Sequence, residues 1–192
     1  MGRPFDADGT RIRVRLDPQE RQLLARLLDE VAQLLDDGRP RSSDPLAALV
    51  GFDLRFPDGA AEDEDPEDTD PALARLLPVA HRDDPELAAE FRRLTESGLR
   101  DRKRSGLALA SAALQRKGHV VLSQEEASAL LKGLTDTRLV LGERLGLKTD
   151  EDADMIADLP RVGGEDDPWV SVVLLYDVLT WWQESLITAL SR

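Results

Sequence analysis

The chain has 192 residues, of which 41% are hydrophobic, and its 25 Lys and Arg against 38 Asp and Glu give a formal net charge of −13. It contains no Cys and two histidines, His81 and His119, so thiol nucleophiles, disulfides and thiolate metal sites are excluded and histidine-based centres have little material. Neither a signal-peptide pattern nor a run of about 18 apolar residues occurs, so we expect a cytosolic protein with no membrane span. We also expect no metal and no cofactor.

Acidic residues are concentrated in two stretches. Residues 62–70 (EDEDPEDTD) contain seven acids and no base, and residues 149–167 contain eight acids and one Arg, which leaves the rest of the chain at about +1. Because such a run repels itself and has nothing apolar to bury, we expect residues 59–70 to be an acidic mobile loop. We expect this loop to interrupt a single helical domain over residues 11–191, preceded by a flexible amino terminus over residues 1–10.

The first expected element is a strand over residues 11–16 (RIRVRL), where basic and apolar residues alternate with period two. A second short strand is expected over residues 119–122 (HVVL), which are rich in β-branched residues. Each strand runs into a capping box, at Asp17 and at Ser123, with Glu three residues later. We expect the two strands to form a minor ribbon packed on the helices, because an isolated ribbon is not stable in water.

Asp-Pro pairs mark most of the expected helix starts, and six of the eleven prolines follow an aspartate. Asp at the N-cap accepts hydrogen bonds from free backbone N–H groups, and Pro at the next position has a preset φ and lacks a donor that would be unpaired there. All of these pairs except Asp65-Pro66, in the acidic loop, precede apolar runs. Together with the box at Ser123, they predict helices over residues 17–37, 44–51, 71–78, 84–117, 123–146 and 168–191.

The long helix expected over residues 84–117 changes its apolar phase. Apolar residues up to Leu94 follow one helical stripe, and those from Leu99 onward follow another. Gly is the costliest ordinary residue in a helix interior, so we expect a kink or a break at Ser97-Gly98.

The last expected helix, over residues 168–191, is the most apolar segment of the chain. Its apolar residues lie on every face, which is typical of a helix that is buried all round. This helix is therefore either the central helix of a bundle or shared between the core and a partner surface. The second interpretation makes Trp181 and Trp182 a candidate interaction surface and predicts a homodimer.

Charged residues also occur on helices whose pattern otherwise indicates core. These are Asp136 and Arg138 on the fifth expected helix and Asp177 and Glu184 on the last. Buried charges must be paired, so we expect Arg138 to bond to Asp177 or Glu184 between two packed helices. With Tyr176 they form a candidate buried polar network, read either as an ion pair that fixes the packing or as a ligand site.

A basic cluster occupies residues 92–104, and Arg93, Arg100 and Arg104 in it can share one helix face. Contacts to a phosphate backbone need such a stripe. However, acids are interleaved with the bases and no aromatic stacking set accompanies them. A solvated face is therefore favoured over an acidic partner surface, and nucleic-acid binding is disfavoured.

Catalytic and metal motifs are weak in this sequence. We find no GxSxG, HExxH, P-loop or GxGxxG pattern, and His81 is expected in a helix entry rather than as a general base. Asp150, Asp152 and Asp154 fit the first positions of a calcium loop, but Met155 replaces its glycine and Arg161 its final Glu. We therefore expect an acidic surface loop there and no catalytic residues.

Five strings together resemble a known family: RLLP at 75–78, HRDDP at 81–85, EFRRLT at 90–95, RLVLGERLG at 138–146 and WQESL at 182–186. Over about residues 11–191 the chain is similar to an actinobacterial family of domains of unknown function that includes the oxidative stress regulator AosR. The resemblance implies a regulator: in that branch, a cysteine-based redox sensor that engages an alternative sigma factor. Because this chain has no Cys, it cannot form the sensing disulfide of that branch.

The sequence as a whole predicts a mainly α fold, a bundle of about five or six helices with a minor two-stranded ribbon. The expected function is that of a non-enzymatic, cytosolic regulatory or protein-interaction module that binds a protein partner, with a sigma factor as the partner implied by the resemblance. Two alternatives stay open. One is a direct nucleic-acid-binding protein, and the other is a ligand-binding protein or enzyme with a pocket around Arg138 and Asp177.

Overall fold

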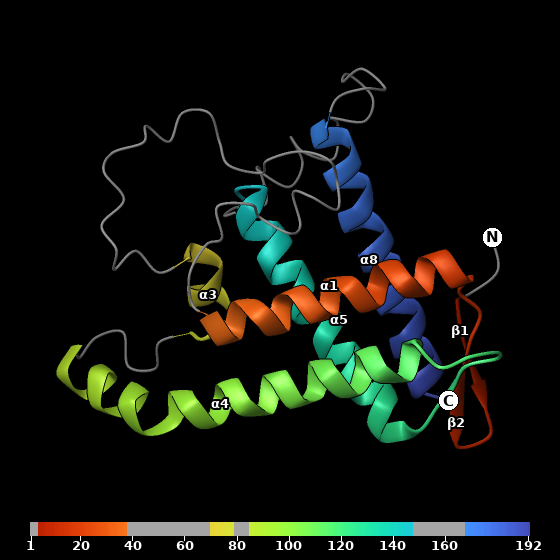
Figure 1. Ribbon diagram of the computed structural model, residues 1–192, viewed down its shortest axis with the longest axis horizontal. Helices are drawn as coiled ribbons and strands as arrows, with labels where there is room; N and C mark the ends of the chain where they lie inside the picture. Colours follow the sequence, from red (N-terminus) through yellow and green to blue (C-terminus); the bar gives the residue numbers. More distant parts are fainter. Residues whose placement is uncertain (1–3, 38–69, 79–84, 148–167) are drawn as a thin grey trace.

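The computed structural model describes residues 4–37, 70–78, 85–147 and 168–192, and these contain five helices and three strands (Figure 1). The elements in chain order are β1 (Phe5–Asp8), β2 (Arg11–Val14), α1 (Pro18–Asp37), α3 (Pro71–Leu76), α4 (Pro85–Leu114), β3 (Val121–Leu122), α5 (Gln124–Arg144) and α8 (Pro168–Leu190). The mainly α fold with a minor β component is confirmed. The helix expected at 44–51 and the acidic segment 59–69 lie outside the described residues.

The described helix starts follow the Asp-Pro pattern. Proline is the first residue of α1, α3, α4 and α8. At α1 the Oδ1 of Asp17 accepts hydrogen bonds from the N–H groups of Gln19 and Glu20, and the Glu20 carboxylate accepts from the Asp17 N–H. The box at Ser123 is complete in the same way, with Glu126 as its partner. Both expected capping boxes are therefore confirmed.

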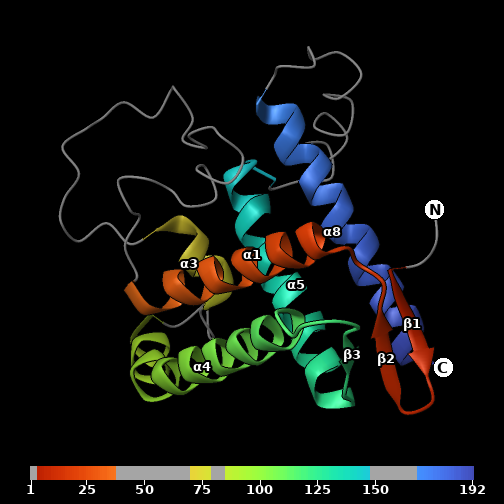
Figure 2. The same ribbon diagram turned by 45° about the vertical axis from the view of Figure 1, so that its right-hand side comes forward.

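Two antiparallel helix pairs cross one another in the fold. Helices α1 and α4 run side by side in one layer, and α5 and α8 run side by side behind them at a steep angle (Figures 1 and 2). Helix α5 contacts α1, α3, α4, α8 and the two strands β2 and β3, so it is the central helix. Of the two interpretations of the last helix, the one that makes it the central helix is therefore wrong, because α8 packs mainly on α5 and β1 at one side of the molecule.

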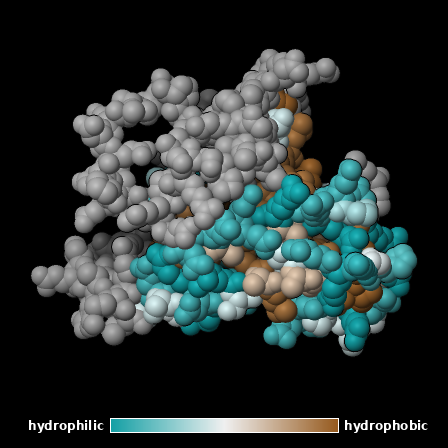
Figure 3. All heavy atoms as spheres, in the orientation of Figure 1, coloured by the Kyte–Doolittle hydropathy of each residue, from teal (hydrophilic) through white to brown (hydrophobic). Residues whose placement is uncertain are grey.

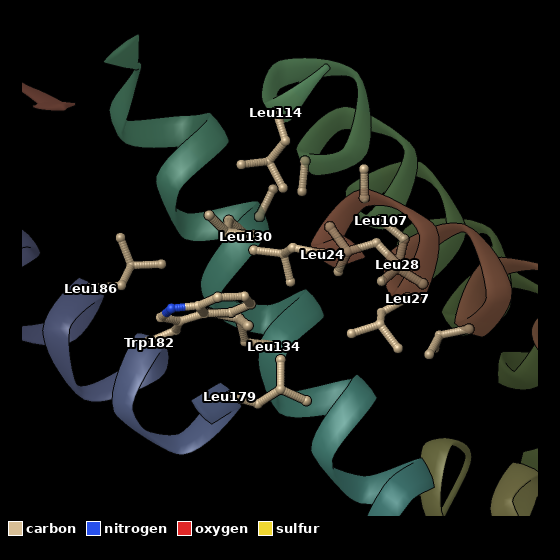
Figure 4. Close-up of a cluster of buried hydrophobic side chains, with 14 of the residues drawn as sticks. Leu24, Leu27, Leu28, Leu107, Leu114, Leu130, Leu134, Leu179, Trp182 and Leu186 are labelled. Carbon is tan, nitrogen blue, oxygen red and sulfur yellow. The ribbon is translucent and has the colours of Figure 1, made fainter. Parts of the chain in front are cut away.

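Leucine side chains from both layers meet in one core. Trp182 of α8 is 1% exposed and points toward α5 (Figure 4). The side chains around it in the same core come from all four long helices and include Leu24, Leu27, Leu28, Leu107, Leu114, Leu130, Leu134, Leu179 and Leu186. Burying one such side chain contributes about 1.5–3 kcal/mol, so this cluster stabilises the packing of the two layers.

The sheet has three strands in the order β1-β2-β3, where we expected two. Strand β2 pairs antiparallel with β1 and with β3, and Phe5 of β1 is 1% exposed. The expectation of a flexible amino terminus is thus wrong for residues 5–8. Gly9 provides the reason: the pairing of Asp8 with Arg11 leaves Gly9 and Thr10 as a two-residue hairpin loop, and the φ of 62° at Gly9 suits a loop with glycine in its first position.

Helix α4 continues without a break through Ser97 and Gly98. The prediction of a helix break is therefore wrong, although the ribbon of α4 curves over its amino-terminal half in Figure 1. The change of apolar phase is explained by the packing of α4 on two helices. Because α4 contacts both α1 and α5, it buries two different apolar faces.

Candidate functional site

Arg138 of α5 forms the expected polar link to α8, but with different partners. Its guanidinium donates to the Oε1 of Gln183 at 2.7 Å and to the hydroxyl of Tyr176 at 3.0 Å. The guanidinium carbon also lies 4.8 Å from the centre of the Tyr176 ring, which is a cation–π distance. Asp177 and Glu184 are exposed, and Arg138 forms no ion pair with either of these described acids. The expected pairing of Arg138 with an acid of the last helix is therefore wrong.

Asp136 is the buried acid of α5, with 5% exposure. Its Oδ1 accepts a hydrogen bond from the Nζ of Lys103 on α4 at 2.5 Å. Burial raises the pKa of Asp136 above its ordinary value, and the hydrogen bond and charge of Lys103 oppose that rise only in part. The pair thus links α4 to α5, whereas the network of Arg138 links α5 to α8.

A pocket of about 380 Å³ opens beside the Lys103–Asp136 pair, between α4 and α5. We call it the α4–α5 pocket. It is lined by Leu99, Arg102, Lys103, Gly106, Leu107, Ala129, Lys132, Gly133, Thr135 and Asp136. Its volume lies within the range of small-molecule sites in proteins.

The basic cluster of α4 is largely engaged inside the molecule. Arg100 bonds to Glu96 and donates to the backbone carbonyl of Leu35 at the end of α1. Arg104 pairs with Asp36 at 2.6 Å. The side chain of Arg93 lies outside the described residues. Two members of the expected phosphate-binding stripe therefore tie α4 to α1.

Two ion pairs attach the short helix α3 to the end of α5. Asp70 is 1% exposed, caps α3 through a hydrogen bond from the Ala72 N–H, and pairs with Arg144. Arg75 of α3 pairs with Glu143 at 2.6 Å. Asp70 is therefore the N-cap that the Asp70-Pro71 pair predicts, but it is buried rather than part of a mobile loop.

Apolar side chains are exposed mainly on α8. Among the described residues, the large exposed hydrophobic side chains are Leu139 on α5 and Leu174, Val178, Trp181 and Ile187 on α8. Leu174, Val178 and Trp181 follow i, i+4, i+7 spacing and so share one face, which we call the α8 stripe. Figure 3 shows apolar surface along the upper part of this helix.

The two adjacent tryptophans of α8 have different roles. Trp181 is 37% exposed and lies on the α8 stripe, whereas Trp182 is buried in the core. Trp182 is therefore not available as part of an interaction surface, which corrects the expectation that both indoles form one. Adjacent side chains on a helix point about 100° apart, so Trp181 reaches the surface while Trp182 faces the core.

The sequence pattern indicates one of these contacts but not another. Lys103 lies four residues after Leu99 and four before Leu107, so the helical period places it on an inward face. Ser185 lies within a buried run of α8, accepts a hydrogen bond from the N–H of Phe5 and donates to its carbonyl. No pattern of the sequence pairs residues 180 positions apart, so that contact becomes visible only in the fold.

These observations define a mainly α protein of two crossed helix pairs and a small antiparallel sheet, with an apolar stripe on its last helix and a small pocket between two others. Its sequence matches the model of a domain of unknown function, DUF2017, over residues 2–190, and the chain belongs to this family. Comparisons with curated proteins and with solved structures find no significant match. None of the helices in the described ranges has the length and apolar character needed to span a membrane.

Proposed function

We propose that the protein is a non-enzymatic regulatory module that binds a protein partner through the α8 stripe. The proposal is supported by the exposure of three apolar side chains: Leu174 is 50% exposed, Val178 38% and Trp181 37%. Apolar side chains that gather on one exposed face mark interaction sites, and Trp is enriched among the residues that dominate binding energy. Scattered single apolar residues carry no such meaning, so the shared face of these three is the observation that supports the function.

The charge beside the stripe indicates the chemistry of the partner. Asp177 and Glu184 are exposed and follow Leu174 and Trp181 by three residues each, so they border the stripe on its solvent side. Helix α8 contains no Lys or Arg. A partner that presents an amphipathic helix, with apolar residues in the middle and bases at the border, would complement this surface.

A second copy of the chain fits this surface less well. An antiparallel pair of α8 helices would bring Asp177 and Glu184 of both copies to the same border, and in either orientation α8 supplies no base. Like charges across an interface disfavour it. We therefore propose a foreign protein rather than a homodimer as the occupant of the stripe.

The resemblance of the sequence to stress-response regulators suggests a class of partner. An alternative sigma factor is the partner engaged in the AosR branch. The chain contains no Cys, so binding here would not be switched by a disulfide of this protein. We propose a sigma factor as the first partner to test.

The two alternative functions have less support. The engagement of Arg100 and Arg104 by acids and backbone of the same chain reduces the charge available to a phosphate backbone. Arg138 is held by Tyr176 and Gln183, and Asp177 points to solvent, so these residues do not converge as a ligand site would require.

Capture from native cytosol with mass spectrometry tests the proposal. The bait is the full chain, beside a stripe variant, Leu174→Ser with Val178→Ser, and a matched control, Leu139→Ser with Ile187→Ser, at apolar positions off the stripe with similar exposure. We expect a sigma factor with the parent chain and the control and at least about tenfold less with the stripe variant. Equal capture by all three would refute the role of the stripe, and capture without a sigma factor would refute that choice of partner.

A further inference from the structure

The α4–α5 pocket has a charge opposite to that of the chain. It contains three bases, Arg102, Lys103 and Lys132, and one acid, Asp136, in a protein whose formal net charge is −13. Lys103 is neutralised by Asp136, at an Nζ–Oδ1 distance of 2.5 Å. Two positive charges therefore stay unbalanced at the pocket.

Arg102 of α4 and Lys132 of α5 have no carboxylate partner among the described residues, unlike the other described bases of α4. Within the described side chains of α4, Arg100, Lys103 and Arg104 each have a carboxylate partner, and Arg102 has none. Lys132 on α5 likewise has no acid partner among the described residues, and both Arg102 and Lys132 are exposed. One free cation on each wall of a single pocket is an arrangement that can bind an anion from both sides.

Gly106 widens the pocket without a packing reason. A Cβ atom at this position would meet nothing within 4 Å, although Gly in a helix interior costs about 1 kcal/mol relative to Ala. Gly133, in contrast, is required by packing, because a Cβ there would lie 2.6 Å from Leu28 Cδ2. Of the two glycines that line the pocket, Gly106 is thus the one whose missing side chain leaves open space. Helix α4 keeps a residue there that lowers helix stability and that packing does not require.

The remaining lining supplies an apolar surface. Leu99, Leu107 and Ala129 line the pocket together with the two free cations and the ion pair. Leu107 is buried in the core, so its side chain provides a rigid contact, while Leu99 is half-buried. A site with apolar contacts and a few well-placed charges is typical of small-molecule binding rather than of a surface for a macromolecule.

We propose that the α4–α5 pocket binds a small organic anion, a carboxylate or sulfonate with an apolar body, between Arg102 and Lys132. The two cations bind the acid group, and Leu99 and Leu107 contact the apolar part. The Lys103–Asp136 pair also lines the pocket and adds no net charge. The site shares no residue with the α8 stripe, so it stands independently of the partner proposed above.

Titration with anilinonaphthalene sulfonate, a fluorescent anion with an apolar body, tests the charges. The variant Arg102→Ala with Lys132→Ala is compared with Arg11→Ala with Lys117→Ala, which removes one exposed Arg and one exposed Lys elsewhere. We expect saturable binding with one site per chain and a Kd raised about tenfold or more by the first pair of substitutions only. Equal Kd values in the two variants, or no saturable binding, would overturn the proposal.

Two further arms separate the pocket from other apolar surfaces. Gly106→Leu should block the probe while it retains the fold, because Leu is a better helix former than Gly and the space before Gly106 is open. Trp181→Ser should leave the fluorescence unchanged, because Trp181 lies on the α8 stripe. Octanoate should displace the probe and octanol should not. Displacement by both, or a response to Trp181→Ser alone, would assign binding to apolar surface in general and reject the anion site.

Discussion

Ionisation of the buried carboxyl of Asp136 opposes folding. Its pKa is raised from 3.8 because burial disfavours the carboxylate, so the folded state binds a proton more tightly than the unfolded state. Stability then falls as the pH rises from that ordinary value through the raised pKa of the folded state. Glu126 of the capping box behaves in the opposite way: burial is opposed by hydrogen bonds from Ser123 and Arg116, which together lower its pKa below 4.5.

Asp136→Asn tests this sign directly. The free energy of unfolding of the parent chain should contain a component that decreases as the pH rises from about 4 toward neutrality, and the variant should lack it. Denaturant titrations of both proteins at a series of pH values give the difference, in which the contributions of the other carboxylates cancel. A difference that increases with pH over this range would mean that Lys103 lowers the pKa of Asp136 instead.

Single residues in need of a partner could be predicted from the sequence, but their partners could not. Asp136 and Arg138 were recognised as charges on core-forming helices, and both are engaged. The helical period indicates which face a residue occupies but not which neighbouring helix lies opposite. The acids of α8 were therefore expected to pair with Arg138, whereas an amide and a phenol do so, and Lys103 pairs with Asp136.

Among the glycines that the structure describes, Gly133 limits how closely two helices can approach. Gly133 of α5 faces Leu28 of α1, and a Cβ atom there would lie 2.6 Å from Leu28 Cδ2 and 3.3 Å from Leu107 Cδ2. These side chains belong to the packed core, where there is little room for adjustment. The contact thus sets how near α1 can lie to α5.

Gly133→Ala should lower the free energy of unfolding by about 1–3 kcal/mol, because the added methyl group forces the core apart. Gly106→Ala is the matched control on α4: with nothing within 4 Å of its Cβ, it should raise stability by about 0.5–1 kcal/mol through helix propensity. Chemical denaturation of the two variants checks both signs. Stabilisation by both substitutions would show that the α1–α5 contact yields easily.

Helix starts were the most predictable elements because their signals are local. An Asp-Pro pair or a capping box involves residues within one turn, and every described helix begins where such a signal stands. Strand β1 was missed because its four residues show no long alternation. It depends on the hairpin at Gly9, on pairing with β2 and on the contact of Phe5 with Ser185, which lies 180 positions away.

The contact between strand β1 and helix α8 connects two segments that lie far apart in the sequence. Phe5 is buried against the end of α8, and its backbone N–H and carbonyl both bond to the Ser185 hydroxyl. Strand β1 is therefore part of the core rather than an appendage. The strings WQESL and RLVLGERLG, on which the family resemblance rests, supply Trp182, Ser185 and Arg138, so they report the fold more than a reaction.

Phe5→Ala should destabilise the whole molecule, because it removes a side chain that is 1% exposed. Substitutions of this kind cost about 3–5 kcal/mol. A single unfolding transition shifted to lower denaturant, in the far-ultraviolet signal of the helices, is the expected result. A flexible amino terminus, as the sequence alone suggested, would leave the transition in place.

Photocrosslinking in an extract of the native cells tests most directly whether the α8 stripe binds a partner. A benzophenone amino acid is placed at Val178 on the stripe or, as a control, at Ala112, which is exposed on α4. We expect one discrete adduct from position 178, absent from position 112, whose partner peptide carries apolar and basic residues at helical spacing. An adduct with a second copy of this chain, or the same adducts from both positions, would contradict this expectation.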